Sequence, residues 1–395
     1  MKQIKMTIRL SSVLILLFII SYNSFAYRVI EDNAAKGGGY DIPIKICIPE
    51  KSDGKLPVMF FVHGGGWNGG DEKSVPPASI PADCEFLCDE MGIIYVGLAY
   101  RCKGNNGTFS LALQDLEASI EWFEDRADEF NADMTRIGFS GGSAGTTLSA
   151  VLSHRYIFCE VYVGREGMYN ILDLDSTKSN FPDAESRAEF GLVTREQKLE
   201  ASPFYHVEKN PPVTLLLHGK DDWLCHYSQS VKYANQIKNS GGNCRLVLYD
   251  GINHTCLNLS YPEVFENSMM EIARTYATGY GLEDVNFRTI QRAVRRKTSL
   301  LHPYDMIPEE KLPGIWGSPR YGKFIFDEYG TGEYVPSNGK SANLSYQVDG
   351  PILRVRVWGE ESTREFYLRM NNQTIYQLIT EENRYKSRRN DFHKQ

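Results

Sequence analysis

The sequence predicts an α/β fold, with a mostly parallel sheet covered by helices on both faces, followed by a small antiparallel β-barrel-like domain. Three observations predict it. Between residues 28 and 282, short apolar runs alternate with helix-like stretches. A glycine-rich turn, GFSGGSAG at 138–145, connects one of these runs to a helix-like stretch. From residue 311 onward, apolar residues recur at every second position in short segments separated by turn residues.

The strands of the first region are expected at five mainly apolar runs. They are PVMFFVHGGGW (57–67), GIIYVGLAY (92–100), TRIGFSGG (135–142), PPVTLLLHG (211–219) and NCRLVLYDG (243–251). Such runs suit central strands that are buried on both faces. An earlier segment, YDIPIKICIP (40–49), has isoleucine at every second position, which is typical of an edge strand. Helices are expected between the strands, among them 111–130 and 228–242.

The second region is expected to form short antiparallel strands. The candidates are KFIFDEYG (323–330), ANLSYQVDG (342–350), ILRVRVWGE (352–360), TREFYLRMNN (363–372) and TIYQLITEEN (374–383). The net charge is +3 over residues 311–395 and −10 over the rest of the chain, so the charge balance changes where the pattern changes. We therefore predict a signal peptide at 1–26, an α/β domain at 27–282, a linker at 283–310 and a β-domain at 311–395. The linker is expected to contain a basic helix-like piece, RTIQRAVRRK (288–297).

The first 26 residues carry the pattern of an exported protein. Lys2, Lys5 and Arg9 precede the apolar run VLILLFII, and Ser24 and Ala26 occupy the small-residue positions of a cleavage site. The apolar run is short for a bilayer span, which needs about 20 residues. We predict cleavage after Ala26, export to the periplasm or the cell exterior, and no stable membrane span after cleavage.

Composition argues against two classes of function. The net charge is −7 and no long run of Lys and Arg occurs in the interior of the sequence, so a nucleic-acid partner is not expected. The eight cysteines all lie before residue 260, too sparse for a disulfide scaffold, and no pair has the spacing of a zinc site. We expect neither a metal nor an organic cofactor.

Two serines in GFSGGSAG lie at the centre of a G-x-S-x-G pattern, which marks a nucleophile on a sharp strand-to-helix turn. If Ser140 were the nucleophile, the following helix would open on GGSAG, and each glycine would cost about 1 kcal/mol relative to alanine. If it is Ser143, the strand runs to Ser140 and the helix begins at Ala144, with Leu148 and Leu152 on one face. We therefore predict Ser143.

The surrounding residues match a family. The segment DMTRIGFSGGSAGTTL resembles that of exported bacterial carbohydrate esterases and the related hormone-sensitive-lipase-like esterases, in register at Ser143. FFVHGGGWNGGDEK is similar to their oxyanion segment, ASPFYHVEKNPPVTLLLHGKDD to the approach to their acid, and LVLYDGINH to the approach to their histidine. The matches span about residues 40–275 and imply an α/β-hydrolase fold.

In an α/β-hydrolase the catalytic residues occur along the chain in the order serine, acid, histidine, so the acid and the histidine must both follow Ser143. His254 follows a predicted strand, where a neutral imidazole can take the serine proton and return it to the leaving group. The family pattern selects Asp222 as the acid, with Asp221 as a capping or solvated neighbour and Asp250 as the less favoured candidate. His218, which precedes these acids, is expected to be a structural residue at a strand end. Cys225 and Cys256 lie close to these residues in sequence, and we consider a disulfide between them, although buried free thiols are the ordinary outcome.

The HGGGW segment supplies the second part of the predicted site. Glycines let the backbone approach a developing oxyanion closely. By resemblance, the backbone amides of Gly65, Gly66 and Ala144 form the oxyanion hole. Trp67 is expected either to line the substrate cleft or to lie in the core, and we assign it to substrate binding.

The resemblance implies a serine carboxylesterase that removes acetyl- or feruloyl-type acyl groups from polysaccharide or small soluble esters. The polar segment between Val163 and Pro212 leaves room only for a modest cap, unlike the apolar lid of a lipase. One alternative is an arylformamidase-like amide hydrolase, which also carries HGGGW. Another is a binding protein, because LPGIWG (312–317) resembles the opening of small lipocalin-like β-domains. Such a barrel can hold a small ligand or be filled by side chains, and we favour the filled barrel.

Overall fold

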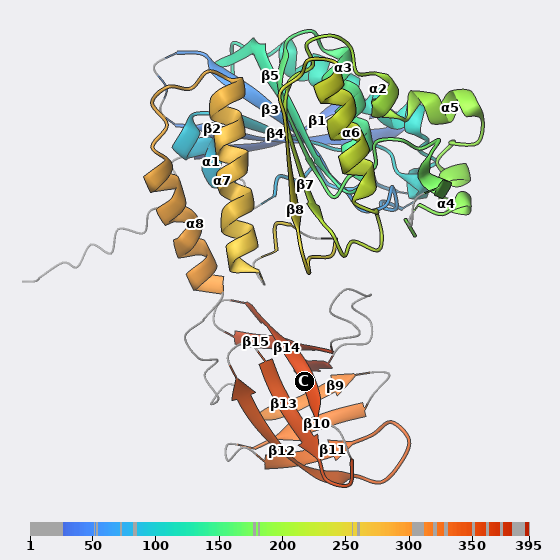
Figure 1. Cartoon of the computed structure of the whole chain (residues 1–395), viewed down its shortest axis with the longest axis vertical. Coiled ribbons are helices and arrows are strands. Elements are labelled where there is room, and N and C mark those ends of the chain that lie inside the picture. The colour runs from blue at the N-terminus through green and yellow to red at the C-terminus, as the bar shows by residue number, and fades with distance from the viewer. Residues whose placement is uncertain are drawn as a thin grey trace, which may run out of the picture.

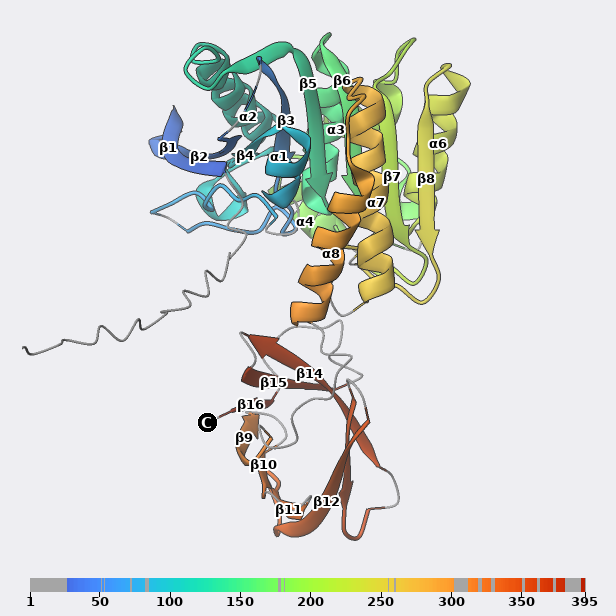
Figure 2. The same ribbon diagram turned by 90° about the vertical axis from the view of Figure 1, so that its left-hand side faces the viewer.

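The structure is a computed structural model of the chain. It describes residues 27–50, 52, 54–71, 73–81, 85–176, 179–180, 182–254, 256–258, 261–301, 312–318, 322–327, 331–349, 352–360, 363–371, 374–380 and 392–394. The expected signal peptide lies outside these residues. Figures 1 and 2 show an α/β domain followed along the chain by a β-domain.

An eight-stranded sheet forms the centre of the α/β domain. Its strands are β1 Tyr27–Gly37, β2 Tyr40–Pro49, β3 Leu56–Val62, β4 Ile94–Leu98, β5 Ala132–Gly142, β6 Cys159–Arg165, β7 Val213–Gly219 and β8 Cys244–Tyr249. The spatial order is β1-β2-β4-β3-β5-β6-β7-β8. Strands β3 to β8 run parallel to their neighbours, whereas β1 pairs antiparallel with β2 and β2 with β4. The mostly parallel sheet predicted from the sequence is present.

The prediction of an edge strand at 40–49 is wrong. Strand β2 lies between β1 and β4, and β1 is the edge. All four isoleucines of β2, which occupy every second position, are buried because the face that carries them packs on the core. Strand β1 hydrogen-bonds to the edge of β2 that faces away from β4. The sequence of β1, YRVIEDNAAKG, is polar and mostly exposed, so it carries no apolar pattern that would reveal a strand.

Helices cover both faces of the sheet (Figure 2). Helices α2 Phe109–Glu124, α3 Ala144–Arg155 and α6 Ser228–Asn239 pack on one face, and α1 Glu85–Met91, α7 Pro262–Gly279 and α8 Phe287–Leu301 on the other. A hydrophobic core lies on each face of the sheet. Each strand contributes side chains to both cores, because successive side chains of a strand point to opposite faces. In β3, for example, Phe60 belongs to the core under α2 and Met59 to the core under α7.

A cap of short helices connects β6 to β7. It contains η2 Leu174–Ser176, α4 Ala184–Glu189, α5 Arg195–Glu200 and η3 Pro203–Tyr205, and a further turn, η1 Lys103–Asn105, precedes α2. Two of the cap helices begin at a side-chain cap, provided by Asp183 in α4 and by Thr194 in α5. The cap is small, as the sequence predicts.

The prediction that residues 283–310 form a linker needs correction. Residues Phe287–Leu301 form α8, which packs along α7 (Figure 1). Ile290 and Val294 are fully buried in the core below α7, and Gln291 donates a hydrogen bond of 2.7 Å to Glu266 of that helix. The helix-like piece expected at 288–297 is therefore confirmed, but it packs on the α/β domain and is not part of a linker.

This packing predicts where the chain can be cut. A protein of residues 27–301 is expected to fold, whereas one ending at Leu282 loses the burial of Ile290 and Val294, about 1.5–3 kcal/mol for each side chain. The conformational entropy that the chain loses when α8 forms offsets part of this stabilisation. We expect the melting temperature of the shorter protein to be lower by about 5 °C or more, measured by circular dichroism. Equal melting temperatures for the two proteins would show that α8 does not stabilise the domain.

The β-domain is an antiparallel barrel. Its strands are β9 Gly314–Ser318, β10 Gly322–Phe326, β11 Thr331–Val335, β12 Ala342–Asp349, β13 Ile352–Val357, β14 Arg364–Asn371, β15 Thr374–Thr380 and β16 Phe392–Lys394. The sheet closes because β9 pairs with both β10 and β16. The five strands expected in this region are confirmed, and β9, β11 and β16 were not predicted. The buried core includes Trp316, Phe324, Leu353 and Phe366.

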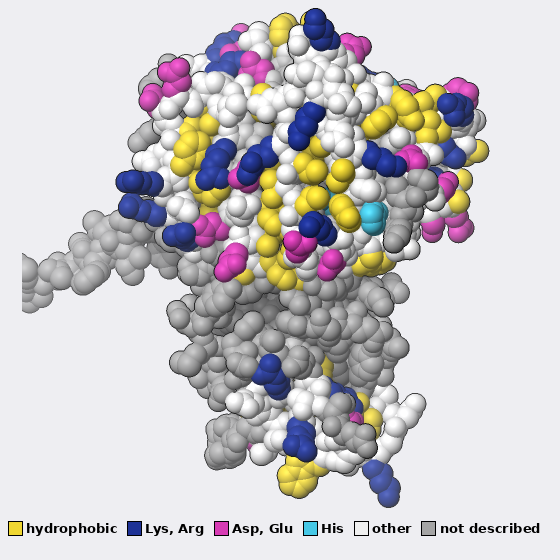
Figure 3. Space-filling view, in the orientation of Figure 1, with side chains coloured by type: hydrophobic (Ala, Val, Ile, Leu, Met, Phe, Trp, Pro, Cys, Tyr) yellow, Lys and Arg dark blue, Asp and Glu magenta, His cyan; other side chains and the backbone are white. Residues whose placement is uncertain are grey.

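The surface of the α/β domain carries mixed charge. Figure 3 shows Lys and Arg interspersed with Asp and Glu over the described residues of one face, without a large patch of one sign. Among the residues that the structure describes, no helix has both the length and the apolar character needed to cross a membrane.

Candidate active site

Ser143 lies on the sharp turn between β5 and α3. Its backbone has φ 52° and ψ −125°, a left-handed conformation that residues with a Cβ rarely adopt. The backbone N–H of Ser143 donates to the carbonyl of Arg165 in the neighbouring strand β6, at 2.8 Å. The side chain makes no capping hydrogen bond to α3, so its hydroxyl is available for another partner. Helix α3 begins at Ala144, as the sequence predicts, but β5 continues to Gly142 and the turn is Ser143 itself.

Gly145 allows this turn to form. A Cβ at this position would lie 2.2 Å from the carbonyl oxygen of Val62 and 2.5 Å from that of His63. Only glycine therefore lets the first turn of α3 approach the end of β3 so closely. The other serine of the pattern, Ser140, is buried within β5.

The structure brings Ser143, His254 and Asp222 together; we refer to these three residues as the triad. His254 Nε2 lies 2.7 Å from Ser143 Oγ, and His254 Nδ1 lies 2.7 Å from Asp222 Oδ2. The three residues follow the carboxyl ends of β5, β7 and β8, which meet at one edge of the parallel sheet. Nδ1 must carry a proton to bond the carboxylate, so Nε2 is free to accept the proton of the serine hydroxyl.

The environment of the triad sets its charges. Burial opposes ionisation of Asp222, but hydrogen bonds from His218 and His254 outweigh it and lower the pKa to about 2. Burial alone would lower the pKa of His254. The hydrogen bond to Asp222 and the charges of Asp222 and Glu166 reverse this and raise the pKa above its ordinary value. The aspartate is therefore charged at neutral pH, and a protonated imidazole is stabilised.

Asp222 is held from several sides. Its Oδ1 accepts backbone N–H groups of Leu224 and Cys225, at 2.9 and 3.0 Å. His218 Nε2 lies 3.1 Å from Asp222 Oδ2 and 2.8 Å from the carbonyl of Cys225, which can only accept, so this nitrogen carries the proton. The remaining ring nitrogen of His218 bonds Ser230 Oγ. His218, expected from the sequence only as a structural residue at a strand end, also holds the carboxylate in place.

The glycine loop after β3 lies against the serine turn. A Cβ on Gly64 would lie 2.6 Å from the carbonyl oxygen of Gly142 and 3.2 Å from Ser143 Cβ. Gly65 and Gly66 follow with φ values of 108° and 67°, which glycine adopts without steric cost. Ala144 is the first residue of α3, so its N–H has no partner within the helix. Gly64 thus places the start of the glycine loop against Ser143, and of the three residues predicted for the oxyanion hole, Gly65 and Gly66 follow Gly64 and Ala144 follows Ser143 along the chain.

The assignment of Trp67 to substrate binding is wrong, because its side chain is completely buried. Its ring stacks on Phe190 with centroids 4.8 Å apart, and Nε1 donates to the carbonyl of Ala144 at 3.1 Å. Trp67 thus ties the glycine loop to the start of α3 from within the core. His63 is also structural: its Nδ1 bonds the carbonyl of Gly64 at 2.8 Å, and its ring stacks on Tyr100.

The remaining candidates lie apart from the triad. Asp250 pairs with Lys220 at the surface, 2.7 Å apart, and Asp221 is exposed. Cys225 and Cys256 are both buried and neither forms a disulfide bond, so the disulfide considered between them is absent. Among the described residues, no group of three or more His, Cys, Asp or Glu side chains is arranged to hold a metal ion.

Two residues near the triad were not predicted from the sequence. Asn253 Oδ1 accepts the backbone N–H of His254 at 2.7 Å and so shapes the loop that carries the imidazole. Glu166, at the end of β6, is buried and adds negative charge near His254. No local sequence pattern identifies either residue, because their roles depend on loops that meet only in the folded chain.

The chain is similar to a known family model and to several curated proteins. Residues 44–237 match the BD-FAE family model. The chain is 26% identical over 258 residues to a probable isoprenylcysteine alpha-carbonyl methylesterase of Arabidopsis thaliana, covering 57% of this chain and 52% of that protein. It is 31% identical over 127 residues to the carboxylesterase NlhH of Mycobacterium tuberculosis, covering 32% of this chain and 38% of that protein. The chain thus spans about half the length, or less, of these curated relatives.

Solved structures support the fold. An esterase of the planctomycete Thermogutta terrifontis superposes with a TM-score of 0.52 at 20% identity, covering 66% of this chain and 94% of the other. The α/β domain therefore has an α/β-hydrolase-like fold. The two curated relatives are named as a probable methylesterase and a carboxylesterase, and the solved structure is that of an esterase.

Proposed function

We propose that the chain is a serine carboxylesterase in which Ser143, His254 and Asp222 form the catalytic triad. The observation that carries this proposal is the continuous hydrogen-bond path from Ser143 Oγ through the imidazole to Asp222, with both distances at 2.7 Å. A serine on a left-handed turn at the end of a central strand, with a positioned imidazole at its hydroxyl, is suited to acyl transfer.

In the proposed reaction, Ser143 Oγ attacks the ester carbonyl while His254 Nε2 takes the hydroxyl proton. Asp222 stabilises the imidazolium that forms. The backbone N–H groups of Gly65, Gly66 and Ala144 stabilise the oxyanion of the tetrahedral intermediate. The intermediate collapses to an acyl-serine, and the alcohol leaves with the proton from His254. Water then attacks the acyl-serine by the same steps, which releases the acid and restores the hydroxyl.

A panel of substrates tests this proposal directly. We expect hydrolysis of p-nitrophenyl acetate and of acetylated and feruloylated oligosaccharides, with a lower kcat/KM on the matching anilides, since an amine is the poorer leaving group. A fluorophosphonate should label Ser143, as located by mass mapping of peptides. Absence of ester hydrolysis across the panel, or faster turnover of the anilides, would contradict the assignment as a carboxylesterase.

The pH dependence follows from the pKa of His254. A protonated imidazole cannot accept the serine proton, so kcat/KM should rise about tenfold per pH unit below this pKa and level off above it. Because Asp222 and Glu166 raise the pKa of His254, we expect the midpoint above the ordinary histidine value of about 6.5. The measurement is a profile of kcat/KM from pH 5 to 9. A midpoint below 6.5 would contradict the charge environment described for the triad.

We further propose that the substrate is an acylated carbohydrate and that the protein is exported. The polar, short cap between β6 and β7 supports a soluble polar substrate, and the sequence of residues 1–26 supports export. The C-terminal barrel is proposed as a lipocalin-like domain whose interior is filled. The aromatic side chains of Trp316, Phe324, Phe326 and Phe366 in its core support a packed interior.

A further inference from the structure

Glu166 is a buried carboxylate that the mechanism above does not use. It follows directly after β6, at the same edge of the sheet as the triad, and its residue exposure is 7%. Its backbone adopts φ 49°, in the left-handed region where residues other than glycine, asparagine and aspartate are uncommon. A long acidic side chain is thus held in an unfavourable backbone conformation, next to Gly167, and is buried there.

The contacts of Glu166 link it to the segments that carry the base and the acid. Its carboxylate oxygen Oε1 accepts the backbone N–H of Cys256, two residues after His254. Its own backbone N–H donates to the carbonyl of Leu217 in β7 at 2.9 Å. Strand β7 leads to Asp222, so Glu166 contacts both the strand before the acid and the loop that holds the imidazole.

The charge of Glu166 acts on His254 together with that of Asp222. Both carboxylates favour the protonated imidazole and raise its pKa. The other titratable groups that sense Glu166 are the buried thiols of Cys225 and Cys256 and the phenols of Tyr169 and Tyr249, whose pKa values burial and this carboxylate raise. Arg165 is the nearby cation, and its guanidinium lies over the ring of Phe61, 5.3 Å from the centroid.

We propose that Glu166 is a positioning residue of the triad: its carboxylate anchors the His254 loop through the N–H of Cys256 and places a second negative charge beside the imidazole. This inference rests on the proposed function, since the imidazole must act as the base. Asp222 orients the ring directly, and Glu166 fixes the segment from which the ring projects. The imidazolium formed during acyl transfer is thereby stabilised from two elements, β6 and the loop after β7.

Two substitutions separate the anchor from the charge. Glu166→Gln keeps an oxygen for the N–H of Cys256 but removes the charge, so the acid limb of kcat/KM should move to lower pH, with kcat at its plateau reduced less than tenfold. Glu166→Ala removes both, and kcat should fall about tenfold or more with KM unchanged, because the base is misplaced and the substrate contacts are not. Glutamine should therefore restore most of the turnover that alanine loses.

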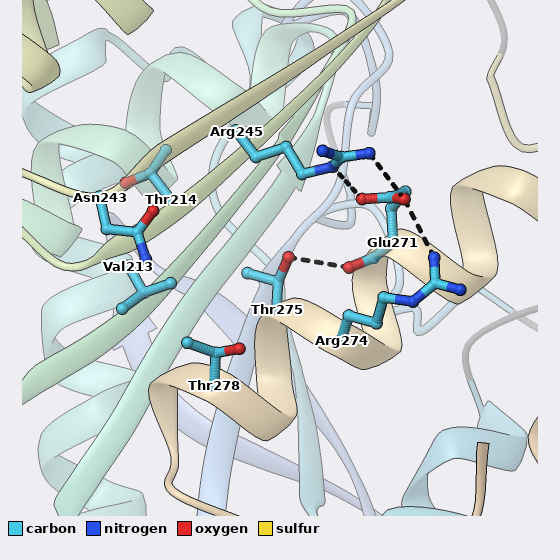
Figure 4. A pocket seen from close by; sticks show the side chains of 8 residues that line it. All are labelled: Val213, Thr214, Asn243, Arg245, Glu271, Arg274, Thr275 and Thr278. Carbon is cyan, nitrogen blue, oxygen red and sulfur yellow. Dashed lines mark hydrogen bonds and ion pairs between the residues drawn. The ribbon is translucent and has the colours of Figure 1, made fainter.

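A matched control removes a buried carboxylate elsewhere. Glu271 on α7 is buried and bonds Arg245 and Arg274 at the far end of the strands, as Figure 4 shows. Glu271→Gln is expected to lower the melting temperature without moving the acid limb. A shift of that limb in Glu166→Gln alone would separate a specific effect on the triad from a general loss of stability.

The titration of the imidazole itself provides a readout that needs no substrate. With histidine labelled by ¹³C at Cε1, the resonance of His254, assigned with His254→Asn, should titrate at lower pH in Glu166→Gln than in the unmodified protein. If the two titrations coincide, or if Glu166→Ala retains the full kcat, the proposal is overturned. Failure of the esterase proposal would instead appear as an unmodified protein that hydrolyses no ester, whatever the titration shows.

Discussion

Replacement of Ser143 by alanine is expected to lower kcat by about 10⁴-fold or more, because it removes the nucleophile while leaving the rest of the site intact. The residual rate would come from the oxyanion hole and substrate binding. Alanine fits the turn as well as serine does, since both carry a Cβ at the same backbone angles. The measurement is kcat on p-nitrophenyl acetate, with the melting temperature as a check on folding.

Ser140→Ala is the matched control for this prediction. Ser140 lies three residues earlier at the centre of the overlapping G-x-S-x-G pattern, but it is buried within β5. Its replacement should preserve most of the activity. Loss of activity in Ser140→Ala with retention in Ser143→Ala would contradict the assignment of the nucleophile.

Asp222→Asn is expected to lower kcat by about 10⁴-fold, although the side chain keeps its size. With the amide oxygen accepting the N–H groups of Leu224 and Cys225, the amide nitrogen takes the place of Oδ2 and presents protons to His218 and His254. His254 would then carry its proton on Nε2, which faces Ser143 and can no longer accept. The expected defect is in kcat, because the substrate contacts are unchanged.

The neighbouring Asp221→Asn serves as the control. Asp221 is exposed, and its carboxylate is not part of the hydrogen-bond path of the triad. We expect kcat/KM to change less than twofold. If Asp221→Asn abolishes activity while Asp222→Asn does not, the acid has been assigned to the wrong residue of the pair.

Much of the site could be predicted from local sequence, because the catalytic residues of an α/β-hydrolase occur in a fixed order along the chain: serine, acid, histidine. The register at Ser143 could be predicted because a helix opening on two glycines is disfavoured, and α3 does begin at Ala144. His254 and Asp222 each follow an apolar strand, and parallel strands deliver their following loops to one edge of the sheet. The residues that the sequence predicts as a triad are therefore brought within hydrogen-bond distance.

The errors arose where tertiary contacts decide the outcome. Trp67 could be expected in a cleft or in the core, and only the position of Phe190 in the cap shows that its ring is enclosed. Five of the fifteen residues of helix α8 are basic, so the burial of Ile290 against the α/β domain was not evident from composition. The anchor contact of Glu166 joins residues 90 positions apart, which no sequence motif records.

The backbone of Ser143 also bears on how such a sequence can evolve. A residue with a Cβ in a left-handed conformation costs about 1–3 kcal/mol, and this cost is tolerated as long as selection maintains the reaction. In a lineage in which hydrolysis no longer matters, glycine at this position would stabilise the fold while eliminating the nucleophile. We therefore expect pseudoenzymes derived from this sequence to lose the serine early, and to melt at a higher temperature than their active ancestor.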